Sequence, residues 1–82
     1  MATIIRVDGT EEALTDLSLA GMQKAVGGYI QMVGTPDGRV MICDEEGKCK
    51  GKDINEKATR LYANPHDVIV GDAIIANDDE ID

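Results

Sequence analysis

The sequence predicts a small α+β domain, in which a mainly antiparallel sheet carries two short helices packed on one face and the elements follow the order β-α-β-β-α-β. Three observations indicate this class. Short runs rich in β-branched residues alternate with two segments of helical spacing, a Pro-Asp-Gly turn separates two of the runs, and 82 residues suffice for a single core. We expect one domain over residues 1–77 and a solvated acidic tail over residues 78–82.

The first predicted elements are a strand, a polar connection and a helix. The strand covers residues 3–8 (TIIRVD), and the acidic residues 9–16 are predicted to connect it to the helix. Ser18 is placed to cap this helix, and Gly27-Gly28 ends it. Its apolar stripe comprises Leu19, Met22, Ala25 and Val26.

A hairpin is predicted next, with strands over residues 29–33 and 39–43. The turn between them reads Thr35-Pro36-Asp37-Gly38, in which proline presets φ and glycine supplies a positive φ. The second strand is almost wholly apolar, which indicates that it is covered on both faces and lies near the middle of the sheet.

A charged turn then leads to a second helix. Residues 49–52 alternate in character and can form a short return strand, and Asp53 and Glu56 form a capping-box pattern at the start of the helix. Asn64-Pro65 is predicted to end this helix. Its apolar positions are Ile54, Ala58, Leu61 and Tyr62.

The last apolar segment has two interpretations. Residues 68–70 and 73–76 are separated by Gly71-Asp72, which is either a two-residue hairpin turn or a bulge within one bent strand. We favour the bulged strand, because hairpin arms of three residues are marginal in water.

Composition restricts the classes of function. The chain contains no Phe and no Trp, so its core is aliphatic, and we expect self-association into a homo-oligomer, most simply a dimer, to bury more surface. The net charge of −8 repels phosphate backbones, which disfavours direct nucleic-acid binding. Because there is neither a membrane-length apolar run nor a signal-peptide pattern, we expect a cytoplasmic protein that does not bind membranes.

The residues with metal-binding or nucleophilic chemistry are Cys43, Cys49 and His66. The cysteine spacing is not that of a zinc knuckle, and a fourth ligand is not evident. The two cysteines flank a turn that would let them face each other, but a cytosolic compartment keeps thiols reduced. We therefore expect no metal, no cofactor and no catalytic residue, with Cys43 in the core and His66 in a loop.

Four segments resemble the DUF3846 family of small proteins of unknown function, encoded mainly by bacteriophages and plasmids. They are GGYIQMV, MICDEEGKCKG, INEKATRLY and DVIVGDAIIA, which occur in this order within residues 27–76. The resemblance implies a phage or mobile-element accessory protein acting inside a bacterial host, and the family has no established catalytic residues to carry over. The chain departs from the family pattern at its two cysteines, where members more often have aliphatic residues, and at Asn64-Pro65-His66.

The leading hypothesis is a non-enzymatic, phage-encoded protein that binds and modulates a host bacterial protein. Acidic residues 44–46 and the acidic tail can imitate a phosphate array, and the second helix presents a polar face opposite its apolar stripe. Both features are equally those of an ordinary solvated surface. The candidate partner-binding residues are Asp44, Glu45, Glu46, Asn55, Thr59 and Arg60.

The alternative hypothesis is a protein that binds or sequesters a small ligand such as a nucleotide signal, acting as an oligomer. Its motivation is the segment GKCKGKD, which places Lys48, Lys50 and Lys52 just before the second helix, where an anion can bind. Asp53 would oppose an anion there, and lysines ordinarily occupy solvated surfaces. An enzyme is the third class, which we reject because a chain this short with a thin core lacks an evident pocket and reactive pair.

Overall fold

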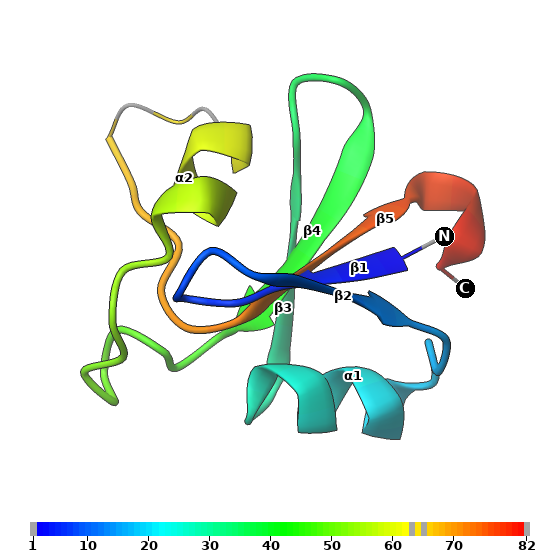
Figure 1. Cartoon of the computed structure of the whole chain (residues 1–82), viewed down its shortest axis with the longest axis horizontal. Helices are drawn as coiled ribbons and strands as arrows, with labels where there is room; N and C mark the ends of the chain where they lie inside the picture. Colours follow the sequence, from blue (N-terminus) through cyan, green and yellow to red (C-terminus); the bar gives the residue numbers. More distant parts are fainter. Residues whose placement is uncertain (1, 63, 65, 82) are drawn as a thin grey trace.

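Five strands form one antiparallel sheet with the order β2-β1-β5-β4-β3 in the computed structural model, which describes residues 2–62, 64 and 66–81. The strands are β1 (Ala2–Ile5), β2 (Glu11–Leu14), β3 (Ile30–Gly34), β4 (Arg39–Asp44) and β5 (Ala73–Asn77). Two short helices, α1 (Leu19–Val26) and α2 (Glu56–Tyr62), pack against the sheet (Figure 1). The predicted α+β class with a mainly antiparallel sheet is therefore confirmed.

The two helices lie on opposite faces of the sheet, so the prediction that both pack on one face is wrong. Met22 and Val26 of α1 share a core cluster with Ile42 and Ile74, whereas Ala58 of α2 shares a second cluster with Met41 and other odd-numbered strand residues. Figure 1 shows α1 below the strands and α2 above them. Because successive strand residues point to opposite faces, the continuous apolar runs of β4 and β5 require cover on both sides.

Strand β2 occupies part of the segment that we predicted to be a connection. It pairs with β1 in a register that sets Glu11 opposite Ile5 and Leu14 opposite Ala2. The sequence pattern did not indicate it because an edge strand exposed to water needs no apolar alternation, and Glu11, Glu12 and Ala13 are all exposed. The element order consequently begins with a hairpin rather than with a single strand.

Helix α1 begins and ends where the sequence indicates. The Ser18 hydroxyl accepts the Gly21 N–H at 3.1 Å as the N-cap, and Gly27 adopts a left-handed φ of 82° as the C-cap. Met22 and Val26 are buried, but Leu19 is exposed, so the apolar stripe is shorter than predicted. The hairpin of β3 and β4 also forms as predicted around the turn at residues 35–38, with Gly34 opposite Val40.

The cap of α2 is Asn55, not Asp53. The Asn55 Oδ1 accepts the Ala58 N–H at 3.0 Å, and the helix starts at Glu56. A return strand over residues 49–52 does not form, because residues 49–51 lie in turns and Lys52 belongs to no strand. The predicted helix end at Asn64-Pro65 includes Pro65, which lies outside the described residues.

The last apolar segment bends at Gly71, whose φ is 76°. Val70 forms an isolated bridge with Ile54, whereas β5 begins at Ala73 and pairs with β1 and β4. The two apolar runs therefore do not pair with each other, which excludes the hairpin interpretation. After β5, Asp78–Glu80 form a 3₁₀ turn, and Ile81 packs against the α1 cluster, so this part of the predicted tail is ordered on the domain.

Candidate binding surface

Asp44, at the end of β4, is the centre of the most strongly connected polar cluster. Its side chain is fully buried (0% exposed), and its carboxylate lies 2.9 Å from the Lys50 Nζ and 2.7 Å from the Lys52 Nζ. Its Oδ1 also accepts the Glu46 N–H at 2.9 Å. Burial raises the pKa of this carboxyl, but the hydrogen bonds from Lys50 and Lys52 outweigh that effect and lower the pKa to about 2.

The two lysines of this cluster also bind the end of helix α1. The Lys50 Nζ donates to the Gly27 carbonyl at 3.3 Å, and the Lys52 Nζ donates to the Val26 carbonyl at 2.7 Å. Cations at a helix C-terminus satisfy its last carbonyls and complement its dipole. We call Asp44, Lys50 and Lys52 the lysine latch, because together they tie the turn after β4 to α1.

The three lysines predicted for an anion site are all occupied by acids of the chain itself. Lys50 and Lys52 belong to the latch, and Lys48 forms an ion pair with Asp67. An anionic ligand at this segment would compete with the carboxylates of Asp44 and Asp67 for these ammonium groups.

The six candidate partner-binding residues are not brought together as one surface. Asp44 and Asn55 are buried, so the prediction that they are exposed is wrong. The Thr59 hydroxyl accepts the Ile69 N–H at 2.9 Å and so faces the chain rather than a partner. The exposed members are Glu45, Glu46 and Arg60.

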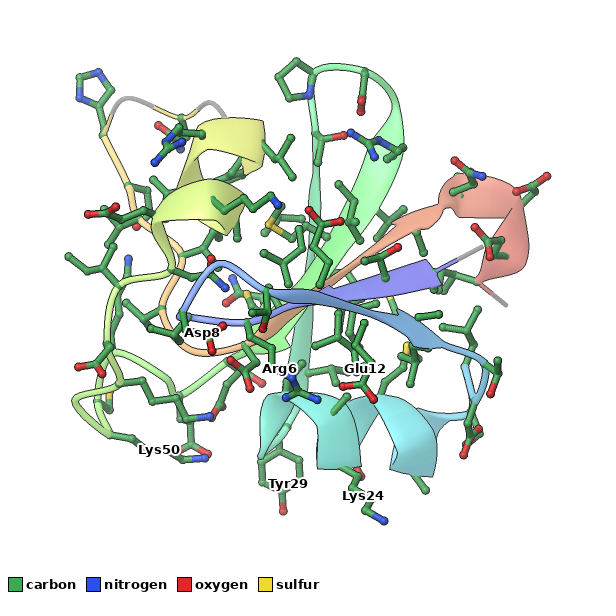
Figure 2. All side chains as sticks on the ribbon, viewed as in Figure 1. Arg6, Asp8, Glu12, Lys24, Tyr29 and Lys50 are labelled. Atoms are coloured by element: carbon green, nitrogen blue, oxygen red, sulfur yellow. The ribbon has the colours of Figure 1, made fainter. Side chains whose placement is uncertain are left out.

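Most cations of the domain form ion pairs with acids of the same chain. Of the eight lysine and arginine residues, all except Lys24 form an ion pair with an acid among the described residues. Figure 2 shows Arg6 beside Glu12 and Lys24 projecting from α1 into solvent. Acids that form no ion pair with a described cation include Asp8, Glu45, Glu46, Asp53, Asp78 and Asp79.

The two acidic runs lie at opposite ends of the sheet. Asn77, which precedes the acidic 3₁₀ turn, pairs with Arg39 at the start of β4, whereas Glu45 and Glu46 follow the end of β4. Figure 1 shows this separation between the turn after β4 and the C-terminal turn. A single partner surface would therefore contact one run or the other.

The turn that carries Glu45 and Glu46 is held by backbone hydrogen bonds. The Glu45 N–H donates to the Tyr29 carbonyl at 2.9 Å, and the Gly47 N–H donates to the Asp44 carbonyl at 3.1 Å. Together with the bond from the Glu46 N–H to Asp44, these contacts hold the backbone of the turn, from which both acidic residues are exposed. We call Glu45 and Glu46 the acidic turn.

A cleft of about 260 Å³ lies beside this turn, between β4 and the segment that leads to β5. Its lining includes Cys43, Lys48, Tyr62, Asp67 and Val70. Both cysteines are free, and Cys43 is buried while Cys49 is exposed. Burial raises the pKa of the Cys43 thiol, and His66 does not line the cleft, so the described lining offers no histidine to pair with the sulfur.

Sequence reasoning missed two exposed apolar side chains, one in strand β3 and one on the residue just before it. Tyr29 is 66% exposed and Met32 is 45% exposed, and Figure 2 shows Tyr29 pointing away from the sheet. The available signal was the absence of any charged residue from 25 to 36, in a chain where 29% of the residues are charged.

Comparison with known proteins gives one family match. The model of the family described as "Domain of unknown function (DUF3846)" matches residues 1–82. Neither the curated proteins nor the solved structures give a match. No helix in the described part of the chain is long and apolar enough to cross a membrane.

Proposed function

The chain belongs to the DUF3846 family, and we propose that it is a phage-encoded accessory protein that binds and modulates a bacterial host protein in the cytoplasm, without catalysing a reaction. The observation that carries this proposal is that most lysine and arginine side chains form ion pairs with acids of the same chain. Since seven of the eight basic residues are paired with acids in the described part of the chain, the acids without an ion pair there give the molecule a negative surface field. The partner that fits this field has a basic binding surface.

The acidic turn is a preorganised part of this surface. Its backbone is held by Tyr29 and by the buried Asp44, so the main chain at Glu45 and Glu46 needs little further ordering when a partner binds. Preorganisation of this kind lowers the entropic cost of association. Complementary charge then raises the association rate and disfavours acidic competitors.

The non-enzymatic part of the proposal is supported by the arrangement around Cys43. The thiol is buried, its pKa is raised, and no histidine lines its cleft among the described residues. A reactive cysteine typically lies in a partly exposed and electropositive site. The alternative of a bound nucleotide has weaker support, because Lys48, Lys50 and Lys52 are all paired with carboxylates.

The proposal is tested by capture from bacterial lysate with a matched pair of charge-reversed proteins. We compare the wild type with the double variant Glu45→Lys/Glu46→Lys and with the control Asp78→Lys/Asp79→Lys, which makes the same change in net charge at the opposite end of the sheet. We expect the wild type and the control to retain the same host protein at low salt. The acidic-turn variant should retain at least about tenfold less, because each interfacial charge reversal costs more than 1 kcal/mol.

Salt provides a second criterion for the same experiment. Retention through exposed charges should fall as the ionic strength rises from about 0.05 to 0.5 M, since the screening length shortens. The proposal is wrong if no host protein is retained at low salt, or if the acidic-turn variant retains it as well as the wild type does.

A further inference from the structure

The two edges of the sheet differ in how they are protected from pairing with another strand. At one edge, β2 carries the exposed Glu11 and Glu12, which pair with Lys57 and Arg6. At the other edge, β3 has the sequence IQMVG and contains neither a charged residue nor a proline. Natural proteins use charges and prolines to prevent edge-to-edge association. Strand β3 lacks this protection.

The peptide groups of β3 show which residues face its open edge. The Glu45 N–H donates to the Tyr29 carbonyl and the Thr35 N–H donates to the Arg39 carbonyl, so Tyr29 and Thr35 face β4. Alternate residues of an antiparallel strand direct their peptide groups to the same side. Ile30, Met32 and Gly34 therefore direct theirs outward, where no other described strand pairs with β3.

We propose that β3 pairs with β3 of a second copy of this chain, antiparallel and centred on Met32, so that two sheets join into one. In this register Met32 lies opposite the partner's Met32, and Ile30 lies opposite the partner's Gly34. The outward-facing peptide groups of one copy then pair with the outward-facing peptide groups of the other. A two-fold symmetric interface requires this match. The inference is independent of the acidic turn and of any host partner.

The side chains fit this register. Met32 lies opposite Ile42 in the sheet, and Ile42 belongs to the cluster under α1, so the two Met32 side chains meet on the α1 face. The bulky Ile30 is set against the partner's Gly34, which has no side chain to obstruct it. Pairing would also cover the 45% exposed Met32.

The charge distribution permits this contact in a chain of net charge −8. Next to β3, Asp37 is paired with Arg39, and Asp44 is paired with the latch lysines. The remaining repulsion between two acidic copies, including that from Glu45 beside Tyr29, is screened by salt. The dimer should consequently become tighter as ionic strength rises, the opposite of the trend expected for a basic host partner.

Sedimentation equilibrium tests the proposal on the full chain between about 1 µM and 1 mM, a range that detects even weak association. We expect the wild type to pass from monomer to dimer. Met32→Lys places two like charges opposite each other at the symmetry axis and should raise the dimer Kd at least about tenfold. The control Ala13→Lys makes the same charge change on exposed β2 and should leave the Kd unchanged.

Amide hydrogen exchange gives a readout that needs no variant. In the wild type, the amides of Ile30, Met32 and Gly34 should become protected as the concentration rises, while those of Gln31 and Val33 are already protected by β4. A wild type that stays monomeric to about 1 mM overturns the proposal. So does a Met32→Lys protein that dimerises like the wild type, or a dimer in which these three amides gain no protection.

Discussion

The side-chain Nδ2 of Asn55 lies 2.8 Å from the carbonyl oxygen of Ile5, which is 50 residues away in sequence. The same Nδ2 donates to the Gly71 carbonyl at 2.9 Å, while Oδ1 accepts the Ala58 N–H. One fully buried side chain thus connects the end of β1, the bend before β5 and the start of α2. Among the described residues, no buried polar side-chain atom lacks a hydrogen-bond partner.

Replacing Asn55 by alanine should be among the most destabilising single substitutions in this domain. The change removes the α2 cap, worth about 1 kcal/mol, and takes a donor from each of two buried carbonyls, each loss costing about 1 kcal/mol. We expect the free energy of unfolding to fall by about 3 kcal/mol, as measured by urea denaturation. The control Asp53→Ala removes the residue that the capping-box pattern indicates and should change it by less than about 0.5 kcal/mol. Equal effects of the two substitutions would contradict the assignment of the cap.

The lysine latch should make the domain sensitive to acid. The pKa of Asp44 is about 2 in the folded protein, below the ordinary value of 3.8. The latch therefore contributes its full stability above about pH 4, and this contribution is lost as the pH falls from about 4 toward 2. Because Lys50 and Lys52 are partly exposed to solvent, we expect a contribution on the order of 1–2 kcal/mol.

The measurement is urea denaturation at intervals between pH 6 and pH 2 for the wild type and for Asp44→Asn. The variant should be less stable near pH 6 and should lose less stability on acidification, since other acids with a lowered pKa, such as Asp37 and Asp67, contribute equally to both proteins. Parallel stability curves across this range would show that Asp44 is not the group responsible.

Gly21 should resist replacement by alanine, although it lies within α1. Such a change ordinarily stabilises a helix by about 1 kcal/mol. Here a Cβ would lie 2.6 Å from the Asp16 backbone carbonyl oxygen and 2.5 Å from the Asp16 Cγ. We expect Gly21→Ala to lower the free energy of unfolding by about 1 kcal/mol. In a double-mutant cycle with Asp16→Ala, the two changes should cost less than their sum, because the smaller side chain relieves part of the clash. A more stable Gly21→Ala protein would refute this expectation.

The two cysteines should react with thiol reagents at very different rates. Cys49 is exposed, whereas Cys43 is buried and its thiol pKa is raised by burial and by the neighbouring Asp44. With a disulfide reagent near pH 8, we expect one fast thiol per native chain and a second that reacts at least about tenfold more slowly. Cys49→Ser should remove the fast phase, and denaturant should equalise the two. Two fast thiols in the native wild type would show that the Cys43 thiol is accessible to the reagent, and would contradict this expectation.

Local signals in the sequence predicted local structure well. Ser18 and Gly27 mark the ends of α1, and the turn at residues 35–38 joins β3 to β4, because capping and turn formation depend on neighbours within a few residues. Strand β2 was not predicted, because a strand exposed to solvent needs no alternation of apolar residues. The one-face arrangement of the helices was wrong even though the apolar run of β4 indicated cover on both sides.

The candidate site was much harder to predict. The sequence places the polar residues Asp44 and Asn55 at the surface, because a polar side chain in a turn or before a helix is usually solvated. Their burial depends on partners that only the fold supplies. Asp44 is paired with Lys50 and Lys52. Asn55 donates to the carbonyls of Ile5 and Gly71.

The sequence by itself determined the fold class, the hairpin, the extent of α1 and the acidic character of the molecule, since composition, turn chemistry and periodicity are properties of the chain. Only the tertiary structure decided which polar groups are buried, which cations are neutralised and which sheet edge is left without charge. Those outcomes depend on contacts between segments far apart in sequence, where the free energy of burying a polar group is set by the atoms that surround it.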